Sequence, residues 1–190
     1  MTGLRERKKR ETRQQLMYTA IRLYGERGFH QVTVEDIAAA ANVSPSTFFR
    51  YFESKAGAVY GLAGVRLEAM RVALNERPAD ASALAVIRDY WRTQFADFQA
   101  APDVYHAQQD LAERYGPVAA ERSRVFDVGR IMAAEALHEE RPDRPLVETE
   151  MIASVLVSAV FTAMRVWHEQ GGDPREALDA CWRIVDKIAD

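Results

Sequence analysis

The sequence predicts an all-α protein with a helix-turn-helix segment near its N-terminus and a larger helical bundle after it. Apolar residues recur at intervals of three and four along most of the 190 residues, which is the period of a buried helix face. No segment alternates apolar and polar residues in the way that predicts a strand. Capping and helix-ending residues separate the periodic segments, so a series of helices is expected.

The segment TVEDIAAAANVSPSTFFRYF (33–52) carries the signals of two short helices joined by a tight turn. Thr33 is a favourable N-cap, and the acidic residue three positions later gives a variant of the capping box. Asn42 suits the left-handed conformation that ends a helix. Ser44 then caps a second helix, whose first position is Pro45, where no backbone donor is lost. These signals predict a helix-turn-helix motif.

The second of these helices is expected to read DNA. Phe48 and Phe52 are four residues apart and form its inward face. Phe49 and Tyr51 lie off that face, so one or both are expected to touch the DNA backbone or a sugar. The remaining early residues are small or polar and suit entry into a major groove. They are Ser44, Ser46, Thr47 and Arg50.

From about residue 10 to residue 60, the chain resembles the TetR family of transcriptional repressors. The likeness includes an amphipathic first helix, the sequence GERGFHQV, the helix-turn-helix segment and the ESK that follows it. It implies an all-helical homodimer with DNA-binding heads and a ligand-sensing body. The DNA-contacting residues that it implies are Thr33, Ser44, Pro45, Ser46, Thr47, Phe49, Arg50, Tyr51 and Lys55.

Two positions depart from the family pattern. Phe49 stands where the family usually has a tyrosine, so a hydroxyl that could bind a phosphate is missing. Gly57 stands where an acidic residue usually completes the cap at Ser54, so a helix starting there is weakly capped. Lys55 opposes the helix dipole, which favours a phosphate contact, although an ordinary surface lysine is the alternative.

Charge is distributed unevenly along the chain. We expect a DNA-binding domain over 1–55 and a ligand-binding and dimerisation domain over 56–190. The first holds 10 Lys/Arg and 6 Asp/Glu and the second 15 and 22, which gives +4 and −7 and the overall charge of −3. A basic head on an acidic body suits a protein that presents one end to DNA, although small charge excesses are common on solvated faces.

Three segments around the helix-turn-helix motif have simple expected structures. Residues 1–10, which are basic, are expected to form a disordered arm that either contacts DNA or only solubilises the chain. A first helix is expected over Glu11–Arg27. A helix over Ser54–Glu76 is expected to connect the head to the body.

The most apolar helix is expected over residues 147–170, and it contains Arg165. It reads as too short and too polar to span a membrane, which takes ~20 apolar residues. With the last helix, it is expected to form a four-helix dimer interface, as the family resemblance also implies. The alternative is a purely internal hairpin. The residues expected at the interface are Val155, Ala159, Leu178, Cys181, Trp182 and Val185; Ile188 continues the same apolar seam.

Large, adaptable side chains in the body indicate a pocket for a small hydrophobic effector, because such residues build apolar pockets between helices. A well-filled core is the alternative for any single residue. The candidate lining residues are Tyr90, Trp91, Phe95, Tyr105, Phe126, Met132, Phe161, Met164 and Trp167. The family resemblance adds effectors of the acyl-CoA-like or lipophilic class.

Catalytic motifs are absent from the sequence. None of the four histidines has a partner at metal-ligand spacing, and there is no phosphate-binding glycine loop and no nucleophile elbow. We therefore expect no catalytic residue, no metal and no cofactor. A single cysteine and the lack of a signal-peptide pattern favour the cytoplasm.

These observations together predict a ligand-responsive DNA-binding repressor that is not an enzyme. Its partners are expected to be a double-stranded operator, a small hydrophobic effector and a second copy of the chain, with no membrane. The alternatives are a helical-bundle enzyme or a carrier of lipids or small molecules, and an architectural DNA binder without an effector.

Overall fold

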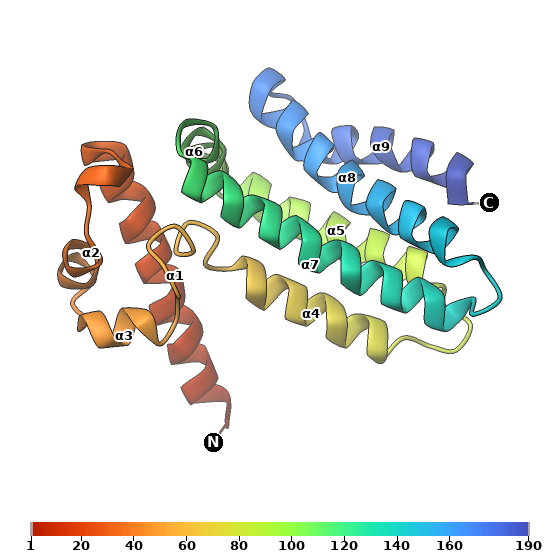
Figure 1. Cartoon of the computed structure of the whole chain (residues 1–190), viewed down its shortest axis with the longest axis horizontal. Helices are drawn as coiled ribbons and strands as arrows, with labels where there is room; N and C mark the ends of the chain where they lie inside the picture. Colours follow the sequence, from red (N-terminus) through yellow and green to blue (C-terminus); the bar gives the residue numbers. More distant parts are fainter. Residues whose placement is uncertain (1, 190) are drawn as a thin grey trace. The chain divides into compact units, whose positions relative to one another are not determined.

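A computed structural model describes the backbone of residues 2–189 and the side chains of residues 3–187 (Figure 1). Over these residues the chain forms nine α-helices and one 3₁₀ helix, and no strand, which confirms the predicted all-α class. The elements are α1 (Thr2–Arg27), η1 (Phe29–Gln31), α2 (Val34–Ala40), α3 (Pro45–Phe49), α4 (Ala63–Asn75), α5 (Ala83–Ala100), α6 (Pro102–Arg114), α7 (Gly116–Glu140), α8 (Leu146–Gln170) and α9 (Pro174–Ala189).

The residues group into two compact units. Unit 1 contains residues 1–65 and 103–124, and unit 2 contains residues 66–102 and 125–190. Unit 1 therefore holds α1, α2 and α3, most of α6 and the first turns of α7. The boundary after residue 55 that the sequence suggested stays a prediction.

The core of unit 1 forms where the apolar stripe of α1 meets the helix-turn-helix segment. Leu16, Tyr24, Phe48 and Val59 are all fully buried in it. Apolar residues of α6 and α7 complete the same cluster; they are Leu111, Ala112 and Val118. Burying this apolar surface fixes where α2 and α3 lie against α1.

The first helix is longer than the sequence analysis expected. It begins at Thr2 instead of Glu11, so the basic arm that was expected to be disordered is helical over residues 2–10. Gly3 is the one helix-weakening residue of this stretch, and it stands at the very end; the rest are mostly good helix formers such as Arg, Lys, Glu and Leu. Residues 3–11 are all exposed, so these turns extend into solvent.

The connecting helix, in contrast, is shorter than expected. Gly57 N–H does donate to Ser54 Oγ at 3.0 Å, as a capping serine requires, but helix α4 begins only at Ala63. Between them the backbone forms successive turns, in which the N–H groups of Val59 and Gly61 donate to the carbonyls three residues earlier, those of Ala56 and Ala58. Close packing explains the departure from a helix: a Cβ on Gly61 would lie 3.0 Å from the Phe52 ring.

The prediction that the most apolar helix is too short to span a membrane is wrong. By length and composition alone, α8 is able to cross a bilayer. In the structure, Ile152, Leu156 and Val160 are buried inside unit 2. Helix α8 runs beside α9 (Figure 1), and the chain itself covers the part of its apolar surface that faces the core of unit 2. Its place in this core accounts for part of its apolar composition, whereas Leu146, Val147 and Met151 are exposed.

The crowding at Gly61 predicts a specific stability difference. Gly61→Ala brings a methyl group to 3.0–3.1 Å from the Phe52 ring, Ala58 O and Met17 Cβ, which should lower the free energy of unfolding by about 1–3 kcal/mol. Gly64→Ala is the matched control, because its Cβ meets nothing within 4 Å and α4 should gain roughly 0.5–1 kcal/mol. Urea denaturation measures both. Equal effects would contradict the close approach at Gly61.

Candidate nucleic-acid interface

The turn between α2 and α3 has the geometry that the sequence predicts. Asn42 is left-handed, with φ of 56°, and it is the one non-glycine residue with positive φ in the described part of the chain. Val43 N–H donates to Ala38 O at 2.9 Å, which closes the turn. The side-chain amide of Gln15 on α1 donates to Ala41 O at 3.1 Å. The turn is therefore fixed from both sides, and α3 has a defined direction.

Three hydroxyl groups gather at the start of α3. Ser44 Oγ accepts from Thr47 N–H at 3.1 Å, which is the N-cap predicted from the sequence. The same oxygen lies 2.8 Å from Ser46 Oγ and 2.9 Å from Thr47 Oγ1. Ser44, Pro45 and Ser46 are exposed and Thr47 is half-buried. This cluster offers small hydrogen-bonding groups to solvent.

The rest of α3 separates an inward from an outward face. Phe48 is fully buried, whereas the side chain of Phe49 is 56% exposed. Arg50 is exposed, and its guanidinium carbon lies 5.4 Å from the centre of the Tyr51 ring. The guanidinium carbon of Arg13 lies 5.8 Å from the same ring centre. The outward face is thus polar and aromatic, with arginine at its end.

Thr33 is engaged in a capping box. Its hydroxyl accepts from Asp36 N–H at 3.1 Å, and Asp36 Oδ2 accepts from the Thr33 N–H at 2.9 Å and from the Thr33 hydroxyl at 2.7 Å. These hydrogen bonds from Thr33 hold the pKa of the Asp36 carboxyl below its usual value. Thr33 is exposed, but its hydroxyl proton is used, and its contact with DNA stays a prediction.

Lys55 is engaged inside unit 1. Its ammonium donates to Phe29 O and to Val32 O, both at 2.8 Å, and lies 4.4 Å from the centre of the Phe29 ring. An ammonium has three N–H groups, so two are bonded and the charge faces a ring. The buried Tyr24 hydroxyl donates to Lys55 O at 2.6 Å. Lys55 therefore joins the end of α1 and η1 to the segment after α3.

A polar cluster in unit 1 was missed by the sequence analysis. Gln108 on α6 is buried and donates to Val59 O at 2.6 Å. Next to it on the chain, Gln109 is buried and accepts from Arg122 at 3.3 Å. The Tyr60 hydroxyl is shielded from solvent, and burial raises the pKa of Tyr60 to about 12. The sequence signal was the pair of glutamines on an otherwise apolar helix face.

The candidate pocket residues are divided between the units. Tyr105 is buried in unit 1, and the other eight belong to unit 2. Within unit 2, Phe126 and Phe161 meet edge to face with ring centres 5.4 Å apart, and the edge of Trp91 meets Tyr90 at 5.8 Å. Phe95, Met164 and Trp167 are buried, and Met132 is half-buried.

A cavity of about 430 Å³ lies elsewhere in unit 2. Asn75, residues 77–82 and Glu140 line it, so it lies at the loop between α4 and α5. Its lining is mostly polar and includes none of the candidate pocket residues. The assignment of those residues to an effector site stays a prediction.

The residues expected at a dimer interface fall into two groups. Ala159, Leu178, Trp182 and Val185 are buried within unit 2, where the chain's own helices cover their side chains, and their place at a dimer interface stays a prediction. The sequence cannot distinguish these buried faces from an outer face, because both are apolar with the same period. Val155 and Cys181 are half-buried.

The outer surface of α8 and α9 carries other apolar side chains. Met151 on α8 and Ile184 on α9 are each 59% exposed. Leu146 and Val147, in the first turn of α8, are still more exposed. Exposed apolar groups gathered on two adjacent helices are typical of an interaction surface.

Comparison with known proteins gives consistent results. The sequence profile of the family described as "Bacterial regulatory proteins, tetR family" matches residues 16–57, which contain the whole helix-turn-helix segment. The HTH-type transcriptional regulator TcmR of Streptomyces glaucescens is 31% identical over 192 residues, covering 95% of this chain and 83% of TcmR. This relationship therefore extends over both units.

Solved structures share the fold along the whole chain. FadR of Thermus thermophilus, a TetR-family repressor in complex with lauroyl-CoA, has a TM-score of 0.63 at 23% identity and matches 91% of this chain and 92% of its own. A TetR-family regulator of Syntrophomonas wolfei has a TM-score of 0.66 at 15% identity and matches 95% and 96%. With a helix-turn-helix of this geometry and a relative that is 31% identical over 95% of the chain, the chain belongs to the tetR family of bacterial regulatory proteins and is a DNA-binding transcription regulator.

Proposed function

We propose that the protein is a dimeric repressor that a small hydrophobic effector releases from its operator. One α3 from each subunit enters one of two successive major grooves of a two-fold symmetric site. The observation that carries this proposal is the exposed face of α3, where Ser44, Ser46 and Thr47 offer hydroxyls while Phe48 anchors the helix from behind. Such a regulator acts in the cytoplasm and needs no catalytic residue.

Hydroxyls and an arginine suit base recognition for simple chemical reasons. Serine and threonine hydroxyls both donate and accept, so they adapt to either base edge, and arginine pairs with guanine through two parallel bonds. The exposed Phe49 ring can contact a thymine methyl group or a sugar. The Ser44 cap and the turn at Asn42 hold these groups in place, which reduces the entropy lost on binding.

The dimer is proposed to form through the outer surface of α8 and α9. Met151 and Ile184 supply exposed apolar area, and Val155 and Cys181 are half-buried beside them on the chain. A symmetric pair presents two copies of the same patch, which is how most soluble oligomers assemble. Two reader helices then have a fixed separation, which a pseudo-palindromic operator matches.

The effector is proposed to bind among the aromatic and methionine side chains of unit 2. The Phe126–Phe161 pair and the half-buried Trp91 and Met132 are large and adaptable, as in apolar ligand sites. The lauroyl-CoA bound by the similar FadR supports an acyl-CoA-like or lipophilic class. Release from DNA requires that the effector bind better to the conformation that does not fit the operator.

Selection from random-sequence DNA tests the proposal. The full chain is incubated with a library of random duplexes, and bound molecules are amplified and sequenced over several rounds. We expect one two-fold symmetric sequence with half-sites about 10 base pairs apart, or a multiple of that spacing. Failure to enrich any sequence would favour a carrier or an architectural binder.

Substitutions on α3 test its role in reading bases. Thr47→Ala and Arg50→Ala should each weaken binding to the selected operator by about 1–3 kcal/mol, because each removes a group that faces the groove. Fluorescence anisotropy measures this binding, and sedimentation should show an unchanged dimer. Glu35→Ala is a matched control on the exposed side of α2. Unaltered binding in both variants would remove these residues from the reader role.

Lys55 gives a sharper test because sequence and structure suggest different roles for it. If it binds a phosphate, Lys55→Met should reduce the slope of log K against log salt by about 0.9 per chain. From its bonds to Phe29 O and Val32 O we expect instead an unchanged slope and a loss of about 1–3 kcal/mol in unfolding free energy. Arg50→Met, the exposed counterpart, should reduce the slope. A reduced slope with full stability in Lys55→Met would refute the structural role.

Charges placed on α8 and α9 test the dimer surface. The double variant Met151→Glu and Ile184→Glu should be monomeric by analytical ultracentrifugation, because each glutamate would have to be buried at the interface without a partner. Its helix content should stay unchanged, since both side chains are exposed in the single chain. Ile131→Glu on α7, also exposed, is the control and should remain dimeric. Dimerisation of the double variant would locate the interface elsewhere.

A further inference from the structure

The positive charge of residues 1–55 is concentrated outside the segment that matches the tetR profile. Residues 16–57 contain four basic and four acidic residues, so their formal charge is zero. Residues 1–13 contain six basic and two acidic residues, which gives +4. The whole positive charge of residues 1–55 therefore lies in the first turns of α1.

Most basic side chains within residues 16–57 also form ion pairs or hydrogen bonds inside the protein. Arg22 pairs with Glu26 at 2.8 Å, and Arg27 lies 3.7 Å from the carboxylate of Asp36. The Lys55 ammonium bonds two carbonyls. Only Arg50 among the basic residues of this segment forms no ion pair or hydrogen bond within the described residues. The surroundings of α3 thus offer little charge for a polyanion such as DNA.

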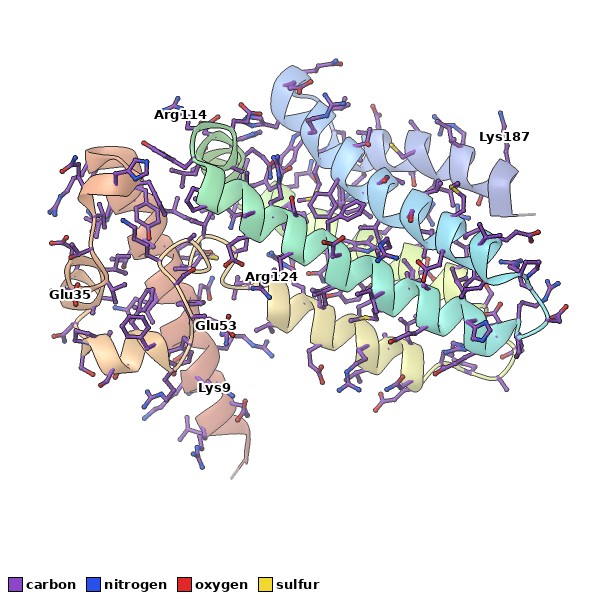
Figure 2. All side chains as sticks on the ribbon, in the orientation of Figure 1. Lys9, Glu35, Glu53, Arg114, Arg124 and Lys187 are labelled. Carbon is purple, nitrogen blue, oxygen red and sulfur yellow. The ribbon has the colours of Figure 1, made fainter. Side chains whose placement is uncertain are left out.

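The first turns of α1 have the opposite character. Among the described residues, the side-chain cations of Arg5, Lys8, Lys9 and Arg10 form no ion pair and no hydrogen bond, and all four side chains are exposed. Leu4 is also exposed, so nothing packs this end of the helix against the rest of unit 1. Figure 2 shows Lys9 on these turns, which extend past α3.

A line of cations connects these turns to the end of α3. Arg5, Lys9 and Arg13 are four residues apart and share one face of α1. Arg13 donates to Gly61 O at 3.1 Å and faces the Tyr51 ring, which Arg50 also faces. The line therefore begins beside Tyr51, just after α3, and continues for about 12 Å from Arg13 to Arg5.

We infer that the first turns of α1 are a docking element for the phosphate backbone that borders the groove entered by α3, and that they supply most of the electrostatic attraction of the head. This inference rests on the proposed operator binding. In the free chain, basic residues at a helix N-terminus oppose the helix dipole, and the pair Arg5 and Lys9 repel each other. Phosphates neutralise both effects. The neutral segment 16–57 reads the bases, and the basic first turns of α1 bind the phosphates. Sequence preference and electrostatic attraction to DNA therefore reside in different parts of unit 1.

The experiment removes these four cations. A variant with Arg5→Gln, Lys8→Gln, Lys9→Gln and Arg10→Gln is compared with the unmodified chain on the operator that the latter selects from random duplexes. Binding is measured by fluorescence anisotropy between about 50 and 200 mM salt. Each lost phosphate contact lowers the slope of log K against log salt by about 0.9, so eight cations per dimer should lower it by up to about 7.

A charge-matched variant controls for overall net charge. It carries four substitutions on exposed basic residues of unit 2: Arg141→Gln, Arg175→Gln, Arg183→Gln and Lys187→Gln. Its slope should equal that of the unmodified chain. The α1 variant should select the same operator sequence but bind it roughly 100-fold more weakly at the lower salt concentration. An unchanged slope in the α1 variant would overturn the inference.

A gain-of-function variant and a structural measurement complete the test. Glu6→Lys adds a cation to the same turns and should steepen the slope, whereas weaker binding would contradict the inference. In hydrogen exchange, residues 3–10 should become protected when operator is added, and continued fast exchange would also contradict it. If the unmodified chain selects no operator, the proposed function itself fails. If it selects an operator but the α1 variant binds that operator with an unchanged salt slope, only this inference fails.

Discussion

The position of α3 depends on the fixed packing of unit 1 around Lys55. Its ammonium bonds Phe29 O and Val32 O, and its own carbonyl accepts from Tyr24, so one residue joins α1, η1 and the segment after α3. Both carbonyls lie in the short connection between α1 and α2, where no α-helical N–H group reaches them. Without a donor such as Lys55, these buried carbonyls would lower the free energy of unfolding. These contacts fix unit 1 on the inner side of α3, and the outer face of α3 remains exposed to solvent.

In the proposed mode of DNA binding, unit 1 separates two tasks that many DNA-binding surfaces combine. Attraction of DNA depends on net charge, falls with salt and carries no sequence information. Base recognition depends on hydrogen-bonding groups held in position. Here the segment with the cap at Ser44 and the turn at Asn42 has no net charge, whereas the exposed turns of α1 are strongly basic. Changes in one part can thus alter affinity without altering the preferred sequence.

Local signals in the sequence were sufficient for the helix-turn-helix motif, because its caps and its turn are specified by single residues. Thr33, Asn42 and Ser44 take the predicted roles. The start of α4 was predicted wrongly, because it depends on the approach of Gly61 to Phe52, which is a tertiary contact. Local signals likewise do not show the hydrogen bonds of Lys55, whose partners Val32 O and Phe29 O are 23 and 26 residues away along the chain; its contact with DNA stays a prediction.

The body was less predictable, because its patterns do not distinguish one burial partner from another. A seam of apolar residues on α9 looks the same whether it packs on the chain's own α8 or on a second subunit. The structure buries Leu178 and Trp182 inside one chain and leaves Ile184 outside. The buried polar groups around Gln108 and Gln109 bring α6 into unit 1, a pairing for which the sequence has no periodic signal.

Directed cleavage of DNA from α3 tests the central claim most directly. Ser46→Cys carries an iron chelate that cuts nearby DNA, and Cys181→Ser removes the one native thiol. If the exposed face of α3 enters the major groove, both strands of each operator half-site should be cut at positions facing that groove, with two-fold symmetry. Cuts confined to the minor groove, or no cuts while the operator remains bound, would contradict the account.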